Sequence, residues 1–169
     1  VVHMAAESHV ARSLHTPDHF LQTNIHGTRV MLDAAVRAGI DRLIHISTDE
    51  AFGQAPHGVA FGPEAPMRPG NAYAASKVGA EALVHAWSHT HGYPAAIVRC
   101  TNNYGPRQHP EKAIPCWILA GLSGGPLPVH GEGTAIRDWL FVGDFARGIE
   151  AGLNRWQDQA TWHFAGQQH

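Results

Sequence analysis

The sequence has little charge and no long apolar run. Charged residues make up 15% of its 169 residues and the formal net charge is −2, whereas globular proteins average about 25% charged residues. So weak a charge argues against a protein that binds nucleic acid or a membrane through basic patches. No apolar run approaches the roughly 20 residues that a membrane-spanning helix needs. At the same time, 44% of the residues are hydrophobic, which excludes a disordered chain.

Cysteine is almost absent. Cys100 and Cys116 are too few for a disulfide scaffold and have no metal-ligand spacing, which favours a reducing, cytoplasmic compartment. His85, His89 and His91 have a helical spacing that could bind zinc. No cysteine or acid accompanies them in a metal-binding pattern, so we expect no metal site.

Lysine is also scarce, because the 12 basic residues include only Lys77 and Lys112. The remainder are arginines. Either the composition has drifted toward arginine, or each lysine has been kept for a specific role.

Short apolar runs alternate with longer amphipathic segments. We predict strands at residues 1–5, 42–47, 95–100, 126–129, 136–142 and 161–165, and helices at 16–38, 72–90, 114–122 and 144–154. Thr16 is expected to cap the first long helix and Gly39 to end it. The buried face of that helix is expected to carry Leu21, Ile25, Thr28, Leu32 and Ala35. Strands separated by helices predict a doubly wound α/β fold with a mainly parallel sheet, which binds ligands at the carboxyl ends of its strands.

Tyr73 and Lys77 lie four residues apart in the second long helix, and therefore project from one face. An ammonium group beside a phenol lowers the phenol's pKa from about 10. Such a tyrosine could move the proton of a sugar hydroxyl. The alternative is a solvated lysine on an amphipathic helix.

Asp49 and Glu50 follow the predicted strand at 42–47 almost directly. Adjacent carboxylates resist ionising together, so one can stay protonated as an acid while the other acts as a base. The alternative is a helix cap or a turn, which Ser, Thr and Asp also favour.

These residues belong to a longer series of motifs. In chain order they are Ala5-Ala-Glu-Ser-His-Val, Thr23-Asn24, Ser47-Thr48-Asp49-Glu50, Tyr73-x-x-x-Lys77, Asn102-Asn103-Tyr104-Gly105-Pro106, Pro110-Glu111-Lys112 and Arg137-Asp138-Trp139. From Val1 to Gly166 the series resembles the NAD-dependent nucleotide-sugar epimerase/dehydratase family, within the extended short-chain dehydrogenase/reductase superfamily. Tyr-x-x-x-Lys is common to the superfamily, whereas Thr-Asp-Glu after a strand is typical of the 4,6-dehydratases. The resemblance is nearest to members that act on dTDP-glucose.

The resemblance implies a lyase with tightly held NAD. Such an enzyme oxidises C4 of the sugar, eliminates water across C5 and C6, and reduces C6. Tyr73 with Lys77 would take the C4 hydroxyl proton, and Thr48 would orient the C4 oxygen. Glu50 would remove the C5 proton while Asp49 protonates the departing C6 hydroxyl.

The resemblance also implies two sets of binding residues. The NAD-binding set is Met4, Ala5, Ala6, Glu7, Ser8, Thr23, Tyr73, Lys77 and Asn103. The substrate-binding set is Ser8, Thr48, Asn102, Lys112, Pro128, Val129, His130 and Arg137. Both lysines thereby acquire a role, which disfavours compositional drift.

The implied fold is a Rossmann-like doubly wound parallel sheet with part of a small substrate-binding lobe. We assign residues 1–104 and 143–169 to a partial NAD-binding domain and 105–142 to a partial substrate-binding segment. None of the 18 glycines forms the glycine-rich phosphate turn of that fold. The sequence also begins inside an apolar run, without an initiator methionine. We therefore expect an N-terminally truncated part of a longer protein, inactive by itself.

The two long helices, at about 17–38 and 72–90, are expected to pair with those of a second subunit in a homodimer. No nucleic-acid or membrane partner is expected. Two other functions stay open. One is an NAD-dependent epimerase, or a 4,6-dehydratase for a UDP- or GDP-hexose; the other is a non-catalytic fragment that keeps only the fold. Asp49 and Glu50 disfavour the epimerase, and the complete catalytic set disfavours the non-catalytic fragment.

Overall fold

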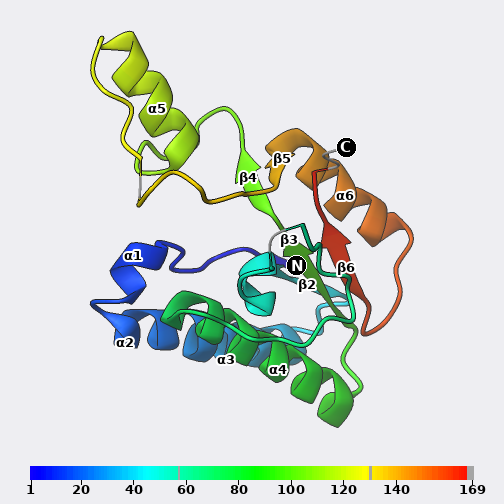
Figure 1. The fold of residues 1–169 in the computed structure, drawn as a ribbon. Coiled ribbons are helices and arrows are strands. Elements are labelled where there is room, and N and C mark those ends of the chain that lie inside the picture. Colours follow the sequence, from blue (N-terminus) through cyan, green and yellow to red (C-terminus); the bar gives the residue numbers. More distant parts are fainter. Residues whose placement is uncertain (57, 130, 167–169) are drawn as a thin grey trace.

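The computed structural model describes residues 1–56, 58–129 and 131–166. Its main sheet has four parallel strands in the order β1-β2-β3-β6 (Figure 1). These strands are β1 (Val2–His3), β2 (Leu43–Thr48), β3 (Ala95–Cys100) and β6 (Thr161–Phe164). The predicted parallel α/β fold is confirmed. Because Thr48 pairs with Cys100, β2 and β3 end level, at the edge where the fold is expected to bind ligands.

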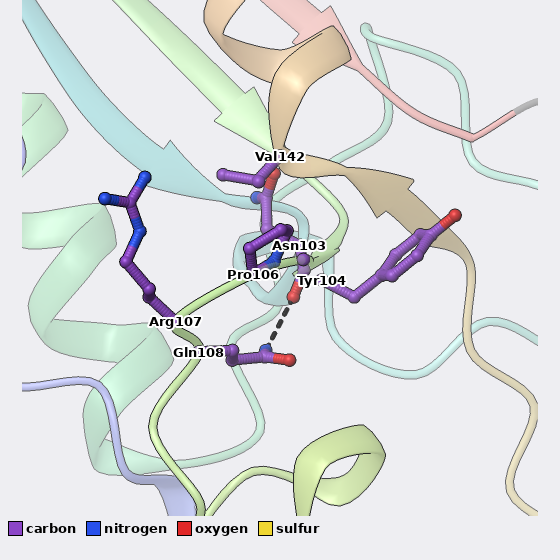
Figure 2. A pocket seen from close by; sticks show the side chains of 7 residues that line it. Asn103, Tyr104, Pro106, Arg107, Gln108 and Val142 are labelled. Atoms are coloured by element: carbon purple, nitrogen blue, oxygen red, sulfur yellow. Dashed lines mark hydrogen bonds between the residues drawn. The ribbon is translucent and has the colours of Figure 1, made fainter. Parts of the chain in front are cut away.

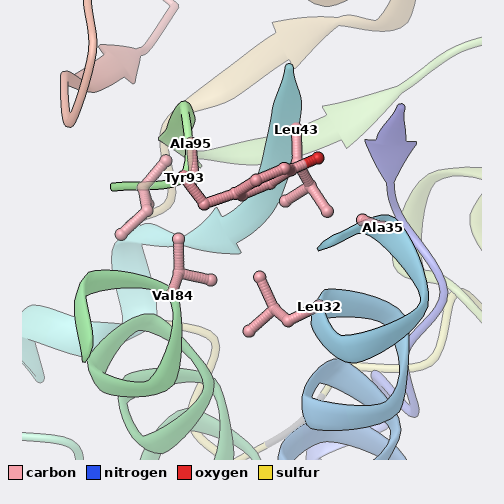
Figure 3. Packing of buried hydrophobic residues seen from close by; sticks show 7 residues of the cluster. Leu32, Ala35, Leu43, Val84, Tyr93 and Ala95 are labelled. Atoms are coloured by element: carbon pink, nitrogen blue, oxygen red, sulfur yellow. The ribbon is translucent and has the colours of Figure 1, made fainter. Parts of the chain in front are cut away.

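Helices cover both faces of this sheet (Figure 1). One face carries α3 (Gly27–Arg37) and α4 (Ala72–His91), and the other carries α6 (Val142–Asn154). Figure 3 shows Leu32 of α3 and Val84 of α4 packed against Leu43 of β2. The next strand residue, Ile44, belongs to the core on the α6 side. Successive strand residues point to opposite faces, which explains why the strand is apolar throughout.

The first long helix is continuous but not uniform. It comprises α2 (Pro17–Phe20), the π-helical segment η1 (Leu21–His26) and α3. Its predicted face is wrong in the first half, because Phe20 and Asn24 are buried whereas Leu21 is 44% exposed. A π-helix has more residues per turn than an α-helix, so residues four apart stay on one face there.

Of the two predicted ends of this helix, the cap at Thr16 is wrong and the end at Gly39 is confirmed. Thr16 makes no capping hydrogen bond, because its hydroxyl instead donates to the carbonyl of Arg12. Pro17 occupies the first turn, as proline prefers. Gly39 has a φ of +61°, a left-handed conformation that suits glycine just after a helix.

A smaller unit follows β3. The strands β4 (Asn102–Tyr104) and β5 (Trp139–Phe141) pair in parallel, although the sequence predicts no strand at residues 102–104. Between them, α5 (Ala113–Leu122) stands apart from the main sheet in Figure 1. The strand predicted at 126–129 is wrong; its prolines, Pro126 and Pro128, cannot donate to a strand ladder. Among the described residues, no helix is both long and apolar enough to cross a bilayer.

A buried ion pair between Glu81 and Arg99 links α4 to β3. The Arg99 Nε donates to Glu81 Oε1 at 3.0 Å, and its Nη2 to Oε2 at 2.7 Å. The Arg99 guanidinium also lies 5.1 Å from the ring centroid of Phe52. Phe52 ends the 3₁₀ segment η2 (Asp49–Phe52), so one arginine joins a helix, a strand and the segment that follows β2.

Candidate active site

The predicted acid pair lies at the carboxyl edge of the sheet. Thr48 is the last residue of β2, and Asp49 and Glu50 begin η2. The Thr48 hydroxyl accepts a hydrogen bond from the Glu50 backbone N–H at 3.2 Å, and lies 3.4 Å from Asp49 Oδ1. Thr48 therefore acts as the cap of η2, and the cap presents both acids at the predicted edge.

The two carboxylates have different surroundings. Burial, followed by the Glu50 charge, raises the pKa of Asp49 from 3.8 to about 6. Glu50 instead accepts a hydrogen bond from Asn71 Nδ2 at 3.0 Å. The structure thus separates the pair into Asp49, part of whose population keeps its proton up to near neutral pH, and Glu50, whose carboxyl oxygen accepts a hydrogen bond.

Asn71 is a site residue that the sequence analysis missed. It is the N-cap of α4, where its Oδ1 accepts from the Ala74 N–H at 2.8 Å. Its other side-chain atom, Nδ2, is the donor to Glu50. Asparagine just before a predicted helix is a readable capping signal, whereas its contact with η2 depends on the topology.

Tyr73 lies at the beginning of α4, near the acid pair. Burial raises the pKa of Tyr73 to about 12; Thr48 opposes this increase, and Cys100, Glu50 and Asp49 add to it. The predicted lowering by Lys77 is therefore wrong in this structure. The reason is that the ammonium points elsewhere.

The Lys77 side chain turns back toward β2. Its Nζ donates to the carbonyl of Ile46 at 2.6 Å and lies 3.4 Å from His45 Nε2. Lys77 is only 3% exposed, and burial lowers its pKa from 10.5 to about 8. The solvated-lysine alternative is thus wrong as well: Lys77 is buried beneath the site.

Residues 4–8, predicted to bind the cofactor, form the loop after β1. Met4, Ala5 and Ser8 are exposed, and Ala6 and Glu7 are half-buried. Thr23, in η1, is exposed.

Buried Asn24 holds this loop, although the sequence analysis assigned it no role. Its Oδ1 accepts from the Glu7 N–H at 2.8 Å, and its Nδ2 donates to the Glu7 carbonyl at 2.9 Å. The same Nδ2 also contacts Ser76 Oγ of α4 at 2.8 Å. An asparagine in the buried stripe of a helix is the signal that could have found it.

The segment before α5 approaches the same loop. Lys112 Nζ donates to the Ser8 carbonyl at 3.3 Å, which brings together two residues predicted to bind substrate. Arg12 lies 3.3 Å from Glu7 and 3.4 Å from Glu111. These contacts join the loop after β1 to residues 111–112.

Asn102 and Asn103 lie in β4, beside the end of β3. Asn103 Nδ2 donates to the Thr101 carbonyl and lies 3.2 Å from Cys100 Sγ. Its Oδ1 is buried without a hydrogen-bond partner among the described residues. Figure 2 shows a pocket next to Asn103, of about 220 Å³, where Gln108 Nε2 donates to the Asn103 carbonyl at 2.8 Å. Asp49 and Glu50 are not among the residues that line this pocket.

Four residues predicted to bind substrate remain: Pro128, Val129, His130 and Arg137. Pro128, Val129 and Arg137 are exposed. The Pro128 carbonyl accepts from Trp117 Nε1, and Arg137 donates to the carbonyl of Ile136. Within the described residues, none of the three makes a hydrogen bond or ion pair with the acid pair, Tyr73 or Lys77. His130 lies outside the described residues.

Comparison with known proteins places the chain in a family. The family described as NAD dependent epimerase/dehydratase matches residues 1–162. A dTDP-glucose 4,6-dehydratase of Streptomyces griseus is 44% identical over 166 residues, which cover 98% of this chain and 50% of that protein. The low-salt glycan biosynthesis protein Agl12 of Haloferax volcanii is 45% identical over 153 residues, covering 90% of this chain and 49% of that protein.

Solved structures give the same result. DesIV, a dTDP-glucose 4,6-dehydratase of Streptomyces venezuelae solved with NAD, has a TM-score of 0.94 and 42% identity, over 98% of this chain and 52% of that one. A UDP-glucuronic acid 4-epimerase of Bacillus cereus has a TM-score of 0.92 and 29% identity, over 99% of this chain and 54% of that one. The chain spans about half the length of the curated relatives it matches. On its sequence, its Rossmann-like fold and its strand-end residues, this chain belongs to the NAD dependent epimerase/dehydratase family.

Proposed function

We propose that the protein carrying this chain is a dTDP-glucose 4,6-dehydratase, which converts dTDP-glucose to dTDP-4-keto-6-deoxyglucose. The observation that supports this most is the division between Asp49, whose pKa is raised to about 6, and Glu50, held by Asn71. Elimination of water needs both an acid and a base. An epimerase, which only oxidises and re-reduces C4, needs neither, although a UDP-glucuronic acid 4-epimerase shares the fold.

NAD is the cofactor implied by the family, and the residues present fit it. Asn103 Oδ1 is buried without a partner among the described residues, and Met4, Ala5 and Ser8 are exposed at the carboxyl end of β1, where such sheets bind ligands. We infer that NAD is held by the full set predicted from the sequence: Met4, Ala5, Ala6, Glu7, Ser8, Thr23, Tyr73, Lys77 and Asn103. When bound, NAD accepts a hydride from C4 of the sugar and returns it to C6.

Thr48 and Tyr73 act at the C4 oxygen in this proposal. Thr48 lowers the pKa of the Tyr73 phenol, and in this proposal one sugar hydroxyl contacts both groups. A phenol with a pKa of about 12 keeps its proton at neutral pH. The base form of Tyr73 therefore requires a nearby positive charge, which Lys77 supplies in this proposal.

Glu50 and Asp49 carry out the elimination. Oxidation at C4 acidifies the hydrogen on C5, and the Glu50 carboxylate removes that proton. Asp49, whose raised pKa keeps part of the population protonated near neutral pH, gives its proton to the C6 oxygen, which leaves as water. Once C6 has been reduced, protonated Glu50 returns a proton to C5, which completes the 4-keto-6-deoxy product.

The finer assignments rest on the resemblance together with local contacts. Lys112, adjacent to Ser8, and Arg137 are cations that suit a diphosphate. Asn102, Pro128, Val129 and His130 complete the substrate set. We assign residues 105–142 to the substrate-binding segment, and 1–104 with 143–169 to the NAD-binding domain.

A homodimer through the two long helices is part of the same proposal. Val30 and Met31 of α3 are 41% and 37% exposed, and a second subunit would cover such apolar side chains. The cytoplasm is the proposed compartment, because Cys100 and Cys116 are both free thiols and free thiols persist in reducing surroundings.

The test is to incubate the complete protein with dTDP-, UDP- and GDP-hexoses and to measure the 4-keto-6-deoxy product. We expect product from dTDP-glucose. Product only from a UDP- or GDP-hexose would correct the substrate, whereas a C4 epimer would favour the epimerase. No product from any of them would reject the dehydratase.

Glu50→Gln tests the role of the base. Without a carboxylate to remove the C5 proton, we expect product formation to fall by about 10²–10⁴-fold, while oxidation at C4 continues and NADH absorbance builds up. The exposed Glu64→Gln is the matched control and should keep the wild-type rate. Water elimination at the normal rate in Glu50→Gln would show that this role is wrong.

A further inference from the structure

His45 is a buried imidazole to which the proposed mechanism assigns no role. It lies in the middle of β2 and is fully buried, at 0% exposure. Its Nε2 lies 3.4 Å from Lys77 Nζ, and the carbonyl of the next residue, Ile46, accepts from the same Nζ at 2.6 Å. Two consecutive residues of β2 therefore surround the ammonium of a catalytic lysine.

The chemistry of the contact fixes the form of the imidazole. A lysine ammonium has three donors and no acceptor, so His45 Nε2 must present its lone pair. The ring proton is then on Nδ1, which is buried and has no hydrogen-bond partner among the described residues. A proton passed to this ring would have no onward route, so the geometry suits holding the ammonium and not relaying its proton.

The other titratable groups around the pair lie on three elements, β1, α4 and β3. His3 of β1 stacks near His45 at 5.3 Å between ring centroids, and its own Nε2 is 3.1 Å from Thr28 Oγ1. Glu81 of α4 and Cys100 of β3 act on Lys77, and Glu81 is already paired with Arg99. Burial and the Lys77 charge keep the pKa of His45 well below its usual value, so the ring stays neutral.

We propose that His45 is a positioning residue for Lys77: its neutral Nε2, together with the Ile46 carbonyl, forms a resting place that keeps the ammonium charged and beneath the site. This deepens the proposed function, on which it rests. Alongside the Glu81 charge, which raises the pKa of Lys77, the two acceptors help a lysine that is 3% exposed to keep a charge that burial opposes.

The first experiment needs no substitution. Nitrogen NMR of the ligand-free complete protein reports which ring nitrogen of His45 carries the proton, with His45→Gln used to assign the signals. We expect the proton on Nδ1 and no second protonation as the pH passes through the ordinary histidine value of 6.5, because burial and the Lys77 charge lower the pKa of His45 well below it. A proton on Nε2 would overturn the proposal.

The second experiment measures the pKa of Lys77 directly. Protein labelled at lysine Cε is titrated by NMR, with the Lys77 signal assigned by its loss in Lys77→Arg. His45→Phe keeps a ring but removes the acceptor, and should lower the Lys77 pKa by about one unit, because hydrogen bonds to charged groups have about that effect. His45→Gln, which restores an acceptor, should return it toward the wild-type value.

Two controls separate this role from packing. His3→Phe changes the neighbouring buried ring but leaves the contact between His45 and Lys77, so the Lys77 pKa should not change. The Lys112 signal is an internal control and should behave alike in every variant. An unchanged Lys77 pKa in His45→Phe would reject the proposal. If His45→Phe does not fold, the tautomer measurement on the wild-type protein decides.

The dehydratase assay then links this titration to function. The high-pH limb of turnover should move to lower pH in His45→Phe and return in His45→Gln. Because both NMR measurements use ligand-free protein, they stand or fall independently of whether the protein dehydrates a sugar.

Discussion

At the residue scale, the folded structure disfavours the ionised form of Asp49. Burial and the Glu50 charge raise its pKa from 3.8 to about 6. The unfolded chain therefore releases this proton at lower pH than the native state does. Asp49 consequently favours folding most below about pH 4, and this contribution is lost as the pH rises through about 6. The proposed reaction uses the same property.

Asp49→Asn should separate stability from activity. The amide has no charge to bury, so at pH 7–8 the free energy of unfolding should rise by about 1–3 kcal/mol. Below about pH 4 the gain should vanish, because wild-type Asp49 is then protonated. Product formation should fall at every pH. Urea unfolding at the two pH values, with the exposed Asp41→Asn as control, provides the measurement, and an equal gain at both would contradict the assigned cause.

At the element scale, the positions of the helices and strands could be predicted from the sequence more accurately than the contacts between them. The predicted strand at 95–100 is confirmed as β3. The predicted helix at 72–90 is confirmed as α4, which ends one residue later, at His91. Their signals are local: a continuous apolar run, and a helix that ends before Gly92. The prediction for 126–129 was wrong because its two prolines block a ladder, and the predicted face near Leu21 was wrong because a π-helical segment changes the turn.

Site contacts between elements were harder to predict for a physical reason. Thr48, Asp49 and Glu50 could be placed together because they are consecutive at the end of a strand. Asn71 could be assigned as a cap but not as a partner of Glu50, because that contact depends on how α4 packs over η2. The direction of Lys77 was also unpredictable, since a helix allows it to face Tyr73 or to turn toward β2.

Asn71 lets the two functions of one side chain be tested separately. Asn71→Ala should cost about 1 kcal/mol of stability through loss of the cap, whereas Asn71→Ser keeps a capping hydroxyl and should cost less. Both lose the donor to Glu50, so both should lower product formation, by about tenfold or more. Urea unfolding and the product assay measure these effects. Wild-type turnover in Asn71→Ser would show that the Glu50 contact does not matter.

At the scale of the whole molecule, the residues proposed to hold NAD are the loop after β1 and the buried polar atom of Asn103, with the acid pair at the end of β2. Beyond β4, α5 and the residues after it expose large apolar side chains, among them Leu122 at 82% and Ile136 at 73%. Side chains so exposed are suited to contact with further protein or with substrate.

The 169-residue chain by itself should bind NAD weakly. None of its 18 glycines forms a glycine-rich phosphate turn, the feature that brings a diphosphate to a helix N-terminus in Rossmann-type folds. We expect a dissociation constant on the order of 1 mM from titration calorimetry. Micromolar binding would mean that the residues after β1, with Asn103, suffice without that turn.

The hydrogen bonds by which Asn24 holds the loop after β1 also limit which amino acids can occupy position 24. Its Oδ1 accepts one hydrogen bond from the Glu7 backbone, and its Nδ2 serves two acceptors, the Glu7 carbonyl and Ser76 Oγ. Aspartate has no N–H to donate, leucine has neither function, and glutamine is one methylene too long for the same two-point contact. None of these three amino acids can therefore reproduce the contacts of Asn24 with Glu7 and Ser76.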